Sequence, residues 1–333
     1  MATLRDLRKR LKAVKNTEKI TKAMKMVAAS KLRRAQNAII QARPYAIRMD
    51  EVLQHIVNTA DVSAHPLLSL RVPRRVEIVV MSSNRGLCGG FNSSILRSAE
   101  RWLKQNASEF DEIRVSTIGR KARDHFRRRG FTLTATYDDI WDDLTYERAS
   151  EIADDLSTRF RTGELDAVYL MFNEFKSAIS QNITLNQLLP IRPLEGWKDD
   201  PNVRVGELAS VSGNALAVAG HDNVAEHLEV EDSDWNPSEV LEVDQVGFDH
   251  VYEPSQVEVL DTLLPQHMGV QIWRALLEST AAEHGARMSA MDAASRNAKD
   301  LIGKLTLQAN RVRQATITTE LMEIVSGAES LKG

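Results

Sequence analysis

The chain has 333 residues, 43% of them hydrophobic, which leaves ample apolar material for one large globular unit or two smaller ones. Its net charge is only −3, no apolar run approaches the roughly 18 residues that span a bilayer, and the charged start MATLRDLRKRLK excludes a secretory signal. The single cysteine, Cys88, excludes an internal disulfide and a paired-cysteine metal site, so we expect a protein of a reducing cytoplasm.

The first predicted element is a long N-terminal helix over residues 1–60. Leu4, Leu7, Leu11 and Val14 are spaced three and four apart, and no glycine or proline occurs before Pro44. The same spacing then places smaller residues on the seam: Thr17, Thr21, Met24, Ala28, Lys31, Ala35 and Ala38. A seam of small residues favours close packing against a partner helix, and Pro44 is expected to bend the helix or to be tolerated within it.

This helix is strongly basic. Residues 1–43 hold thirteen Lys and Arg against two Asp and Glu, and no aromatic residue that could stack on a base. A charge run of this kind is most often a solvated face, and nucleic-acid binding is the rarer interpretation. The turn from Met24 to Ala29 is apolar nearly all round, so one partner helix cannot cover it and surfaces of other chains are implied.

The middle of the chain, residues 74–194, alternates between strand and helix patterns. Strands are predicted at 76–81, 113–119, 132–137 and 167–175, and helices at 93–106, 121–130 and 145–160. The stretch 180–191 is expected to add a final strand or a helix. This alternation predicts an α/β domain, Rossmann-like, with a mostly parallel sheet.

A glycine-rich loop, SSNRGLCGGFNSS, lies between the first strand and the helix that follows it. It lacks the lysine of a phosphate-binding P-loop and the spacing of the dinucleotide fingerprint. We therefore favour a tight turn with Asn92 or Ser93 as helix N-cap over a nucleotide site. Cys88 has no histidine nearby to activate it, so a small buried hydrophobe is favoured over a nucleophile.

Residues 195–249 form an acidic insertion, with fourteen Asp and Glu against two Lys and Arg and with scattered Gly, Pro and Asn. It is expected to consist of loops or short strands. After it, residues 258–331 predict a C-terminal helix, whose seam runs through Met291, Ala298 and Leu305 to Met322. Two helices of this length can satisfy their seams by pairing with each other, as an antiparallel coiled coil.

Nothing in the sequence indicates a metal or cofactor site. The eight histidines contain no pair at i, i+4 spacing, and the HEXXH motif is absent. We therefore expect no metal, no cofactor and no catalytic residue.

Three segments together resemble the γ subunit of the F-type ATP synthases. They are NTEKITKAMKMVAASKLRRAQ (16–36), SNRGLCGGFN (83–92) and RQATITTELMEIVSGA (313–328), and the stretch that begins YEPSQVEVLDTLLP agrees in order. The resemblance covers nearly everything except 195–249, and it points to the bacterial type.

The resemblance implies a non-catalytic rotor. The terminal helices would form the central stalk inside a ring of α and β subunits, and the α/β domain would lie near ε and the c-ring. The chain would be peripheral to the cytoplasmic face of the inner membrane and bind no nucleic acid. Its rotation would couple proton flow to ATP synthesis or hydrolysis on the β subunits.

The resemblance also implies particular subunit contacts. The shaft and the glycine-rich loop would contact β through seven residues: Met24, Arg85, Cys88, Arg313, Gln314, Thr318 and Glu320. The acidic insertion is longer than expected of ordinary bacterial members, so it is interpreted as a regulatory or species-specific loop, or as a tolerated ornament.

Two other functions remain open from the residues alone. One is a stand-alone nucleotide-dependent α/β enzyme with a coiled-coil arm, which would bind a nucleotide by itself. The other is a basic coiled-coil protein that binds nucleic acid, with steep salt dependence. Neither explains the small-residue seams or the apolar turn near Met24.

Overall fold

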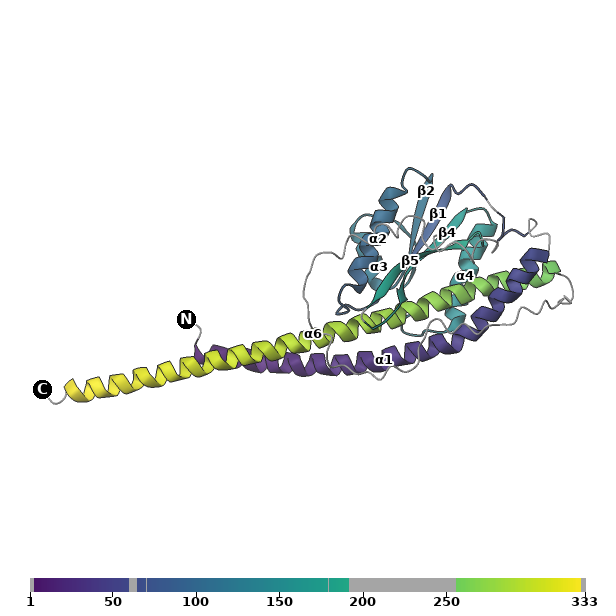
Figure 1. Cartoon of the computed structure of the whole chain (residues 1–333). Coiled ribbons are helices and arrows are strands. Elements are labelled where there is room, and N and C mark those ends of the chain that lie inside the picture. Colours follow the sequence, from purple (N-terminus) through teal and green to yellow (C-terminus); the bar gives the residue numbers. More distant parts are fainter. Residues whose placement is uncertain (1–2, 60–64, 70, 179, 192–255, 331–333) are drawn as a thin grey trace.

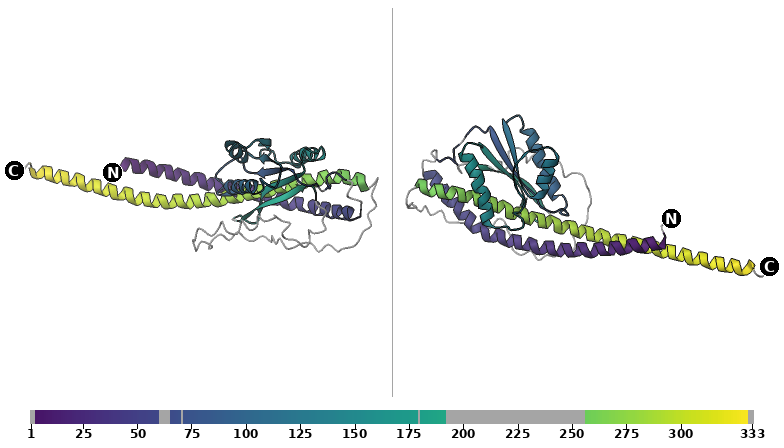
Figure 2. Two further views of the ribbon diagram at one scale, coloured as in Figure 1. Left: turned by 90° about the horizontal axis from the view of Figure 1, so that it is seen from above. Right: turned by 180° about the vertical axis from the view of Figure 1, so that it is seen from behind.

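A computed structural model describes residues 3–59, 65–69, 71–178, 180–191 and 256–330. Two long terminal helices run side by side as a rod, and an α/β layer packs against one end of it (Figure 1). The N- and C-termini lie at the opposite end of the rod, where one helix reaches beyond the other (Figures 1 and 2). The α/β fold class with a coiled coil of terminal helices is thus confirmed.

The N-terminal helix α1 spans Leu4–Thr59 without a break. Thr3 caps it, because its Oγ1 accepts a hydrogen bond from the Asp6 N–H (3.3 Å) while the Asp6 carboxylate accepts one from the Thr3 N–H (3.4 Å). Pro44 lies within the helix, and α1 curves over its second half (Figure 1). The proline therefore does not end the helix.

The C-terminal helix α6 spans Gln256–Ser330, 75 residues, so it begins slightly earlier than predicted and contains Pro265. It runs antiparallel to α1, as the sequence predicted. At ~1.5 Å per residue the two helices are about 84 and 112 Å long, so α6 must outreach its partner.

The seam between the two helices follows small residues. The buried positions of α1 are Leu7, Thr21, Ala28, Leu32, Ala35, Met49 and Leu53. Lys31, which the sequence pattern placed on the seam, is exposed, and Leu32 is buried in its place. The correction has a physical reason: the helical repeat of 3.6 residues drifts past a three-four pattern, and the apolar side chain is the one buried at that turn.

Five strands form one sheet in the order β3-β2-β1-β4-β5. The strands are β1 (Arg75–Met81), β2 (Glu112–Ile118), β3 (Leu133–Tyr137), β4 (Ala167–Phe175) and β5 (Gln181–Leu189). The first four pair in parallel, and β5 is antiparallel to β4 at the edge. The sequence predicted either a strand or a helix at 180–191, and the structure shows a strand, because β5 turns back from β4 and pairs with it along its length.

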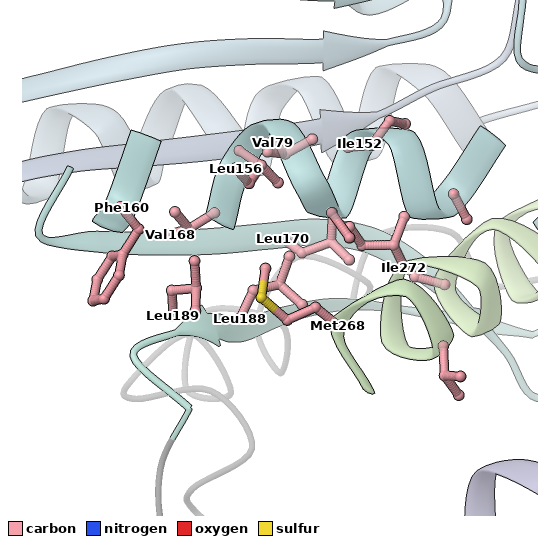
Figure 3. Packing of buried hydrophobic residues seen from close by; sticks show 14 of the residues in the cluster. Val79, Ile152, Leu156, Phe160, Val168, Leu170, Leu188, Leu189, Met268 and Ile272 are labelled. Atoms are coloured by element: carbon pink, nitrogen blue, oxygen red, sulfur yellow. The ribbon is translucent and has the colours of Figure 1, made fainter. Parts of the chain in front are cut away.

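Helices cover both faces of the sheet. Helices α2 (Phe91–Gln105) and α3 (Arg120–Arg128) pack on one face, and α4 (Tyr146–Arg161) packs on the other together with the first third of α6 (Figure 1). Figure 3 shows Met268 and Ile272 of α6 pointing toward Leu170 and Leu188 of the sheet. The rod and the α/β layer therefore share one apolar core.

The acidic insertion predicted at 195–249 lies outside the described residues. Its two attachment points are described: Ile191 follows β5, and Gln256 begins α6.

Candidate functional site: the exposed shaft and the loop beside it

The end of α6 beyond α1 is exposed on every side. Lys25 Nζ pairs with Asp292 Oδ1 at 2.6 Å across the two helices. Because antiparallel helices advance together, the first residue of α1 lies beside residue ~313 of α6. From Arg313 to Ser326 every side chain is exposed, so this stretch, called the tail here, has no partner within the described chain.

The tail carries large apolar side chains. Ile317, Leu321, Met322, Ile324 and Val325 are each at least half exposed, up to 70% for Ile324. Enclosing five such side chains is worth on the order of 10 kcal/mol, at ~1.5–3 kcal/mol each. An exposed apolar helix of this kind marks an interaction surface.

The N-terminal half of α1, which lies next to the tail along the rod, combines positive charge with further exposed apolar residues. Ile20, Met26 and Val27 are more than half exposed, while Ala28 is buried against α6 and Met24 is half-buried. The exposed basic side chains nearer the N-terminus are Arg5, Arg8, Lys9, Arg10, Lys12, Lys15, Lys19 and Lys22. This surface suits a partner that is acidic and also offers apolar contacts.

The glycine-rich loop forms a tight turn from β1 into α2, as predicted. Gly89 has φ +56°, a conformation that glycine adopts without strain, and Leu87 has φ 63° with its side chain 64% exposed. A leucine in this left-handed region is strained, so the loop holds an apolar side chain outward at a conformational cost.

The predicted N-cap is wrong. Gly90 is the N-cap of α2, and Asn92 lies inside the first turn without capping it. Asn92 instead ties the loop together: its Oδ1 accepts from the Ser83 N–H at 3.0 Å, and its Nδ2 donates to the Ser83 hydroxyl at 2.8 Å. The side chain closes the loop across its base, which the local sequence pattern does not reveal.

Cys88 is buried, 2% exposed, in a small cluster with Phe91 and Ala282. Burial raises the pKa of its thiol, which disfavours the thiolate. The interpretation of Cys88 as a small buried hydrophobe is thus confirmed. Its thiol cannot touch another chain unless the loop opens.

Arg287 of α6 holds the loop against the shaft. Its guanidinium donates to the Gly86 carbonyl oxygen at 3.3 Å, and it pairs with Glu283 at 2.6 Å one turn back along the helix. The same group lies 3.3 Å from His284 Nδ1. We call this set of Glu283, His284 and Arg287 the latch.

The electrostatics of the latch follow from burial. Burial lowers the pKa of His284 to about 4, with Arg287 and Lys31 adding to the shift, so its imidazole is neutral. Burial raises the pKa of the Glu283 carboxyl, against the opposing effect of Arg287. Sequence reasoning missed the latch, because an i, i+4 Glu and Arg pair is the usual pattern of a solvated face.

The predicted contact residues fall into two separate places. Arg313, Gln314, Thr318 and Glu320 are all exposed on the tail, with the Thr318 hydroxyl donating to the Gln314 carbonyl oxygen at 3.0 Å. Arg313 and Glu320 are two turns apart on one side of the helix, while Gln314 and Thr318 are one turn apart on another.

The remaining contact residues gather around the loop. Arg85 is exposed at the loop, and Met24 lies beside residue ~293 of α6, level with the loop. The tail begins about 35 Å further along α6, at ~1.5 Å per residue, so the two places are distinct surfaces of one rod.

No helix in the described ranges is long and apolar enough to cross a membrane. Within the same ranges no cluster of three or more potential metal ligands occurs.

Comparison with known proteins gives the family. A family model described as ATP synthase matches residues 3–331. The ATP synthase gamma chain of Geobacter metallireducens is 45% identical over 333 residues, which covers 100% of both chains. That of Anaeromyxobacter sp. strain Fw109-5 is 46% identical over 335 residues, again covering 100% of both. Both matches run through the acidic insertion, so the idea that the insertion is specific to one species is wrong.

Solved structures agree in fold. The central stalk and c-ring structure of Tetrahymena thermophila mitochondrial ATP synthase contains a chain with TM-score 0.56 and 25% identity, covering 83% of this chain and 99% of that one. A chain of the Euglena gracilis mitochondrial ATP synthase has TM-score 0.61 at 19% identity, covering 98% and 94%. With a family match over nearly the whole length and close bacterial relatives, this chain belongs to the gamma-chain family of the ATP synthases.

Proposed function

We propose that the chain is the rotor of the central stalk, turning inside a ring of α and β subunits and coupling proton flow to ATP synthesis or hydrolysis on β. The observation that carries this is the tail, a helix end that is exposed on every side and carries five large exposed apolar side chains. A ring that encloses the tail accounts for every exposed face of it at once, which a single docked partner would not.

The shape of the shaft supports the coupling. At its tip only α6 is present, and further down the rod has two helices and then the loop on one side (Figure 1). A shaft of this asymmetry contacts each surrounding subunit differently at each angle. Differential contact of this kind shifts the conformational equilibrium of each β subunit as the shaft turns.

In this proposal the chain catalyses nothing itself. The α/β layer lies toward ε and the c-ring, and the complex holds the chain at the cytoplasmic face of the bacterial inner membrane. Met24 and Arg85 contact β at the level of the loop. The contacts on the tail are made by Arg313, Gln314, Thr318 and Glu320. Cys88 supports the loop from within.

The test is a double substitution, Gln314→Ala with Thr318→Ala, in the reconstituted complex. We expect weaker coupling and slower ATP turnover, because both side chains lie on one side of the tail and make polar contacts with β in this proposal. The matched control is Gln308→Ala with Thr306→Ala, also exposed but below the tip. Unchanged proton pumping and turnover in the first variant would refute these contacts.

A further inference from the structure

The outer face of α2 and α3 is strongly basic. Residues 91–105 and 120–129 together hold nine Lys and Arg against two Asp and Glu. The two helices lie next to each other on the same face of the sheet, away from the rod (Figure 1). None of the proposed contacts with β lies on this surface.

The two acidic side chains of this face are already paired. Glu100 pairs with Arg129 and, at 2.8 Å, with His125, which ties α2 to α3. Asp124 pairs with Arg123 at 2.9 Å. They therefore leave other cations of the face without a counter-charge.

Five of these cations are exposed: Arg97, Arg101, Lys104, Arg127 and Arg128. Within the described chain, no carboxylate lies within ion-pair distance of any of them. Arg97, Arg101 and Lys104 follow each other at i, i+4, i+7 and so form a single stripe along α2. Like charges at this spacing repel one another, so an anion lying along the stripe would be stabilising.

The stripe borders a shallow depression of about 390 Å³, lined by Arg97, Glu100, Arg101, Lys104 and Gln105. The depression is open to solvent, which is unlike an enclosed site for a small anion. An extended acidic chain fits it better, because it can pair with several cations in a row.

The sequence supplies such a chain. Residues 195–249 hold fourteen Asp and Glu against two Lys and Arg. They leave the fold after Ile191, at the end of β5, where Leu189 pairs with Val168 near the start of β4. The starts of the parallel strands and the end of α2 share this edge of the sheet, because α2 runs back before β2 begins at Glu112.

Reach does not limit this contact. Adjacent strands are ~4.8 Å apart, so five strands are about 20 Å wide, whereas an extended chain covers ~3.3 Å per residue. The competing basic face, on α1, is further away. Lys25 is held beside Asp292, which is about 54 Å from Gln256 along α6 at ~1.5 Å per residue.

We propose that the acidic insertion 195–249 docks on the basic face of α2 and α3 of its own chain. The contact is electrostatic: each exposed pair contributes little by itself, but several act together, and the tether holds the partners at a high effective concentration. The docked state is therefore reversible and weakens with salt, since the Debye length falls from ~10 Å at 0.1 M to ~3 Å at 1 M.

Lys104 reports on this contact. The experiment compares the acylation rate of the Lys104 amine, followed by mass spectrometry of its peptide, in the full chain and in a variant lacking 197–247. We expect several-fold slower acylation in the full chain at low salt, and equal rates at high salt. A zero-length carbodiimide cross-linker should in addition join Lys104 or Lys121 to acidic residues of the insertion.

Charge reversal separates docking from a local effect on the amine. The double substitution Arg97→Glu with Arg101→Glu is introduced into both the full chain and the chain lacking 197–247. At low salt, the Lys104 acylation rates of these two chains should then be equal. The matched control, Arg33→Glu with Arg34→Glu on exposed α1 positions, should keep them apart. Equal Lys104 rates in the unaltered full and deleted chains at low salt, or cross-links confined to α1 lysines, would overturn the proposal whatever the fate of the rotor assignment.

Discussion

At the scale of single residues, the latch decides how the loop is held. Cys88 lies beneath the loop, and Arg287 binds the loop from α6 through the Gly86 carbonyl. Leu87 is held outward in a strained conformation above them. The arrangement links the α/β layer to the shaft at the level where Met24 lies.

Removing the latch should expose the thiol. In Arg287→Ala the loop loses its hydrogen bond to α6, so we expect Cys88 to react with a maleimide at least ~10-fold faster, because reaction of a buried thiol requires local opening. The matched control is Arg296→Ala, whose partner Asp292 lies within the same helix and whose side chain is 60% exposed. A Cys88 rate equal to that of the unaltered chain would show that Arg287 does not hold the loop.

His284 should make stability depend on pH. Its pKa is about 4 in the fold against an ordinary 6.5, so between these values the unfolded chain binds the proton and the fold does not. Stability from this group is therefore complete above pH 6.5 and falls as pH drops toward 4, by up to about 3 kcal/mol.

The comparison that isolates this effect is His284→Gln. Chemical denaturation of both chains from pH 4 to 7 should show a shallower decline in the variant. Glu278 and Glu283 have raised pKa values, which act in the opposite direction, so only the difference between the two chains is informative. Parallel curves would mean that the pKa of His284 is the same in the folded and the unfolded chain.

At the scale of elements, the long helix α6 changes character along its length. Its first part packs against the sheet, its middle pairs with α1, and its tail contacts nothing within the described chain. The same type of side chain should therefore contribute differently to the free energy of unfolding at different points along α6.

Leu305 and Leu321 test this directly. Leu305 is 9% exposed and Leu321 is 57% exposed in the same helix. In the free chain, we expect Leu305→Ala to lower the free energy of unfolding by about 2 kcal/mol and Leu321→Ala to change it by less than ~0.5 kcal/mol. Urea denaturation measures both. Equal losses would mean that the tail is packed in the free chain.

At the scale of the whole molecule, a rotor has to turn as one body. The α1 and α6 helices share a seam and the Lys25–Asp292 pair, and α6 shares a core with the sheet. Relative sliding of the two helices would break the seam and the Lys25–Asp292 pair together, while α6 stays joined to the sheet, so torque applied at one end reaches the other.

Locking the helices together should thus leave the complex active. With Lys25→Cys and Asp292→Cys joined by a short thiol cross-linker, we expect ATP hydrolysis by the complex to continue at nearly its former rate. Lys25→Cys alone, treated with the same reagent, controls for modification near Met24. A cross-linked complex that loses turnover would show that the two helices move against each other during the cycle.

The secondary-structure elements and the family follow from local patterns in the chain. Spacing of Leu4, Leu7 and Leu11 predicted a helix because burial of one face requires that period, and alternating strand and helix patterns predicted a parallel sheet. The motifs at 16–36, 83–92 and 313–328 carried the resemblance. Each of these features depends on residues that are close together in the chain, so the spacing and identity of those residues are enough to predict it.

The tertiary structure decided what depends on residues far apart in the chain. Leu32 rather than Lys31 is buried on the seam, because helical drift and a partner helix together choose the position. Arg287 meets Gly86 across 201 residues of chain, so no local pattern encodes that contact. Asn92 closes a loop rather than capping a helix, because its side chain reaches back to Ser83. The tail has no partner within the described chain because α6 is longer than α1 and extends beyond its first residue. This difference becomes visible only when the Lys25–Asp292 pair fixes the register of the two helices.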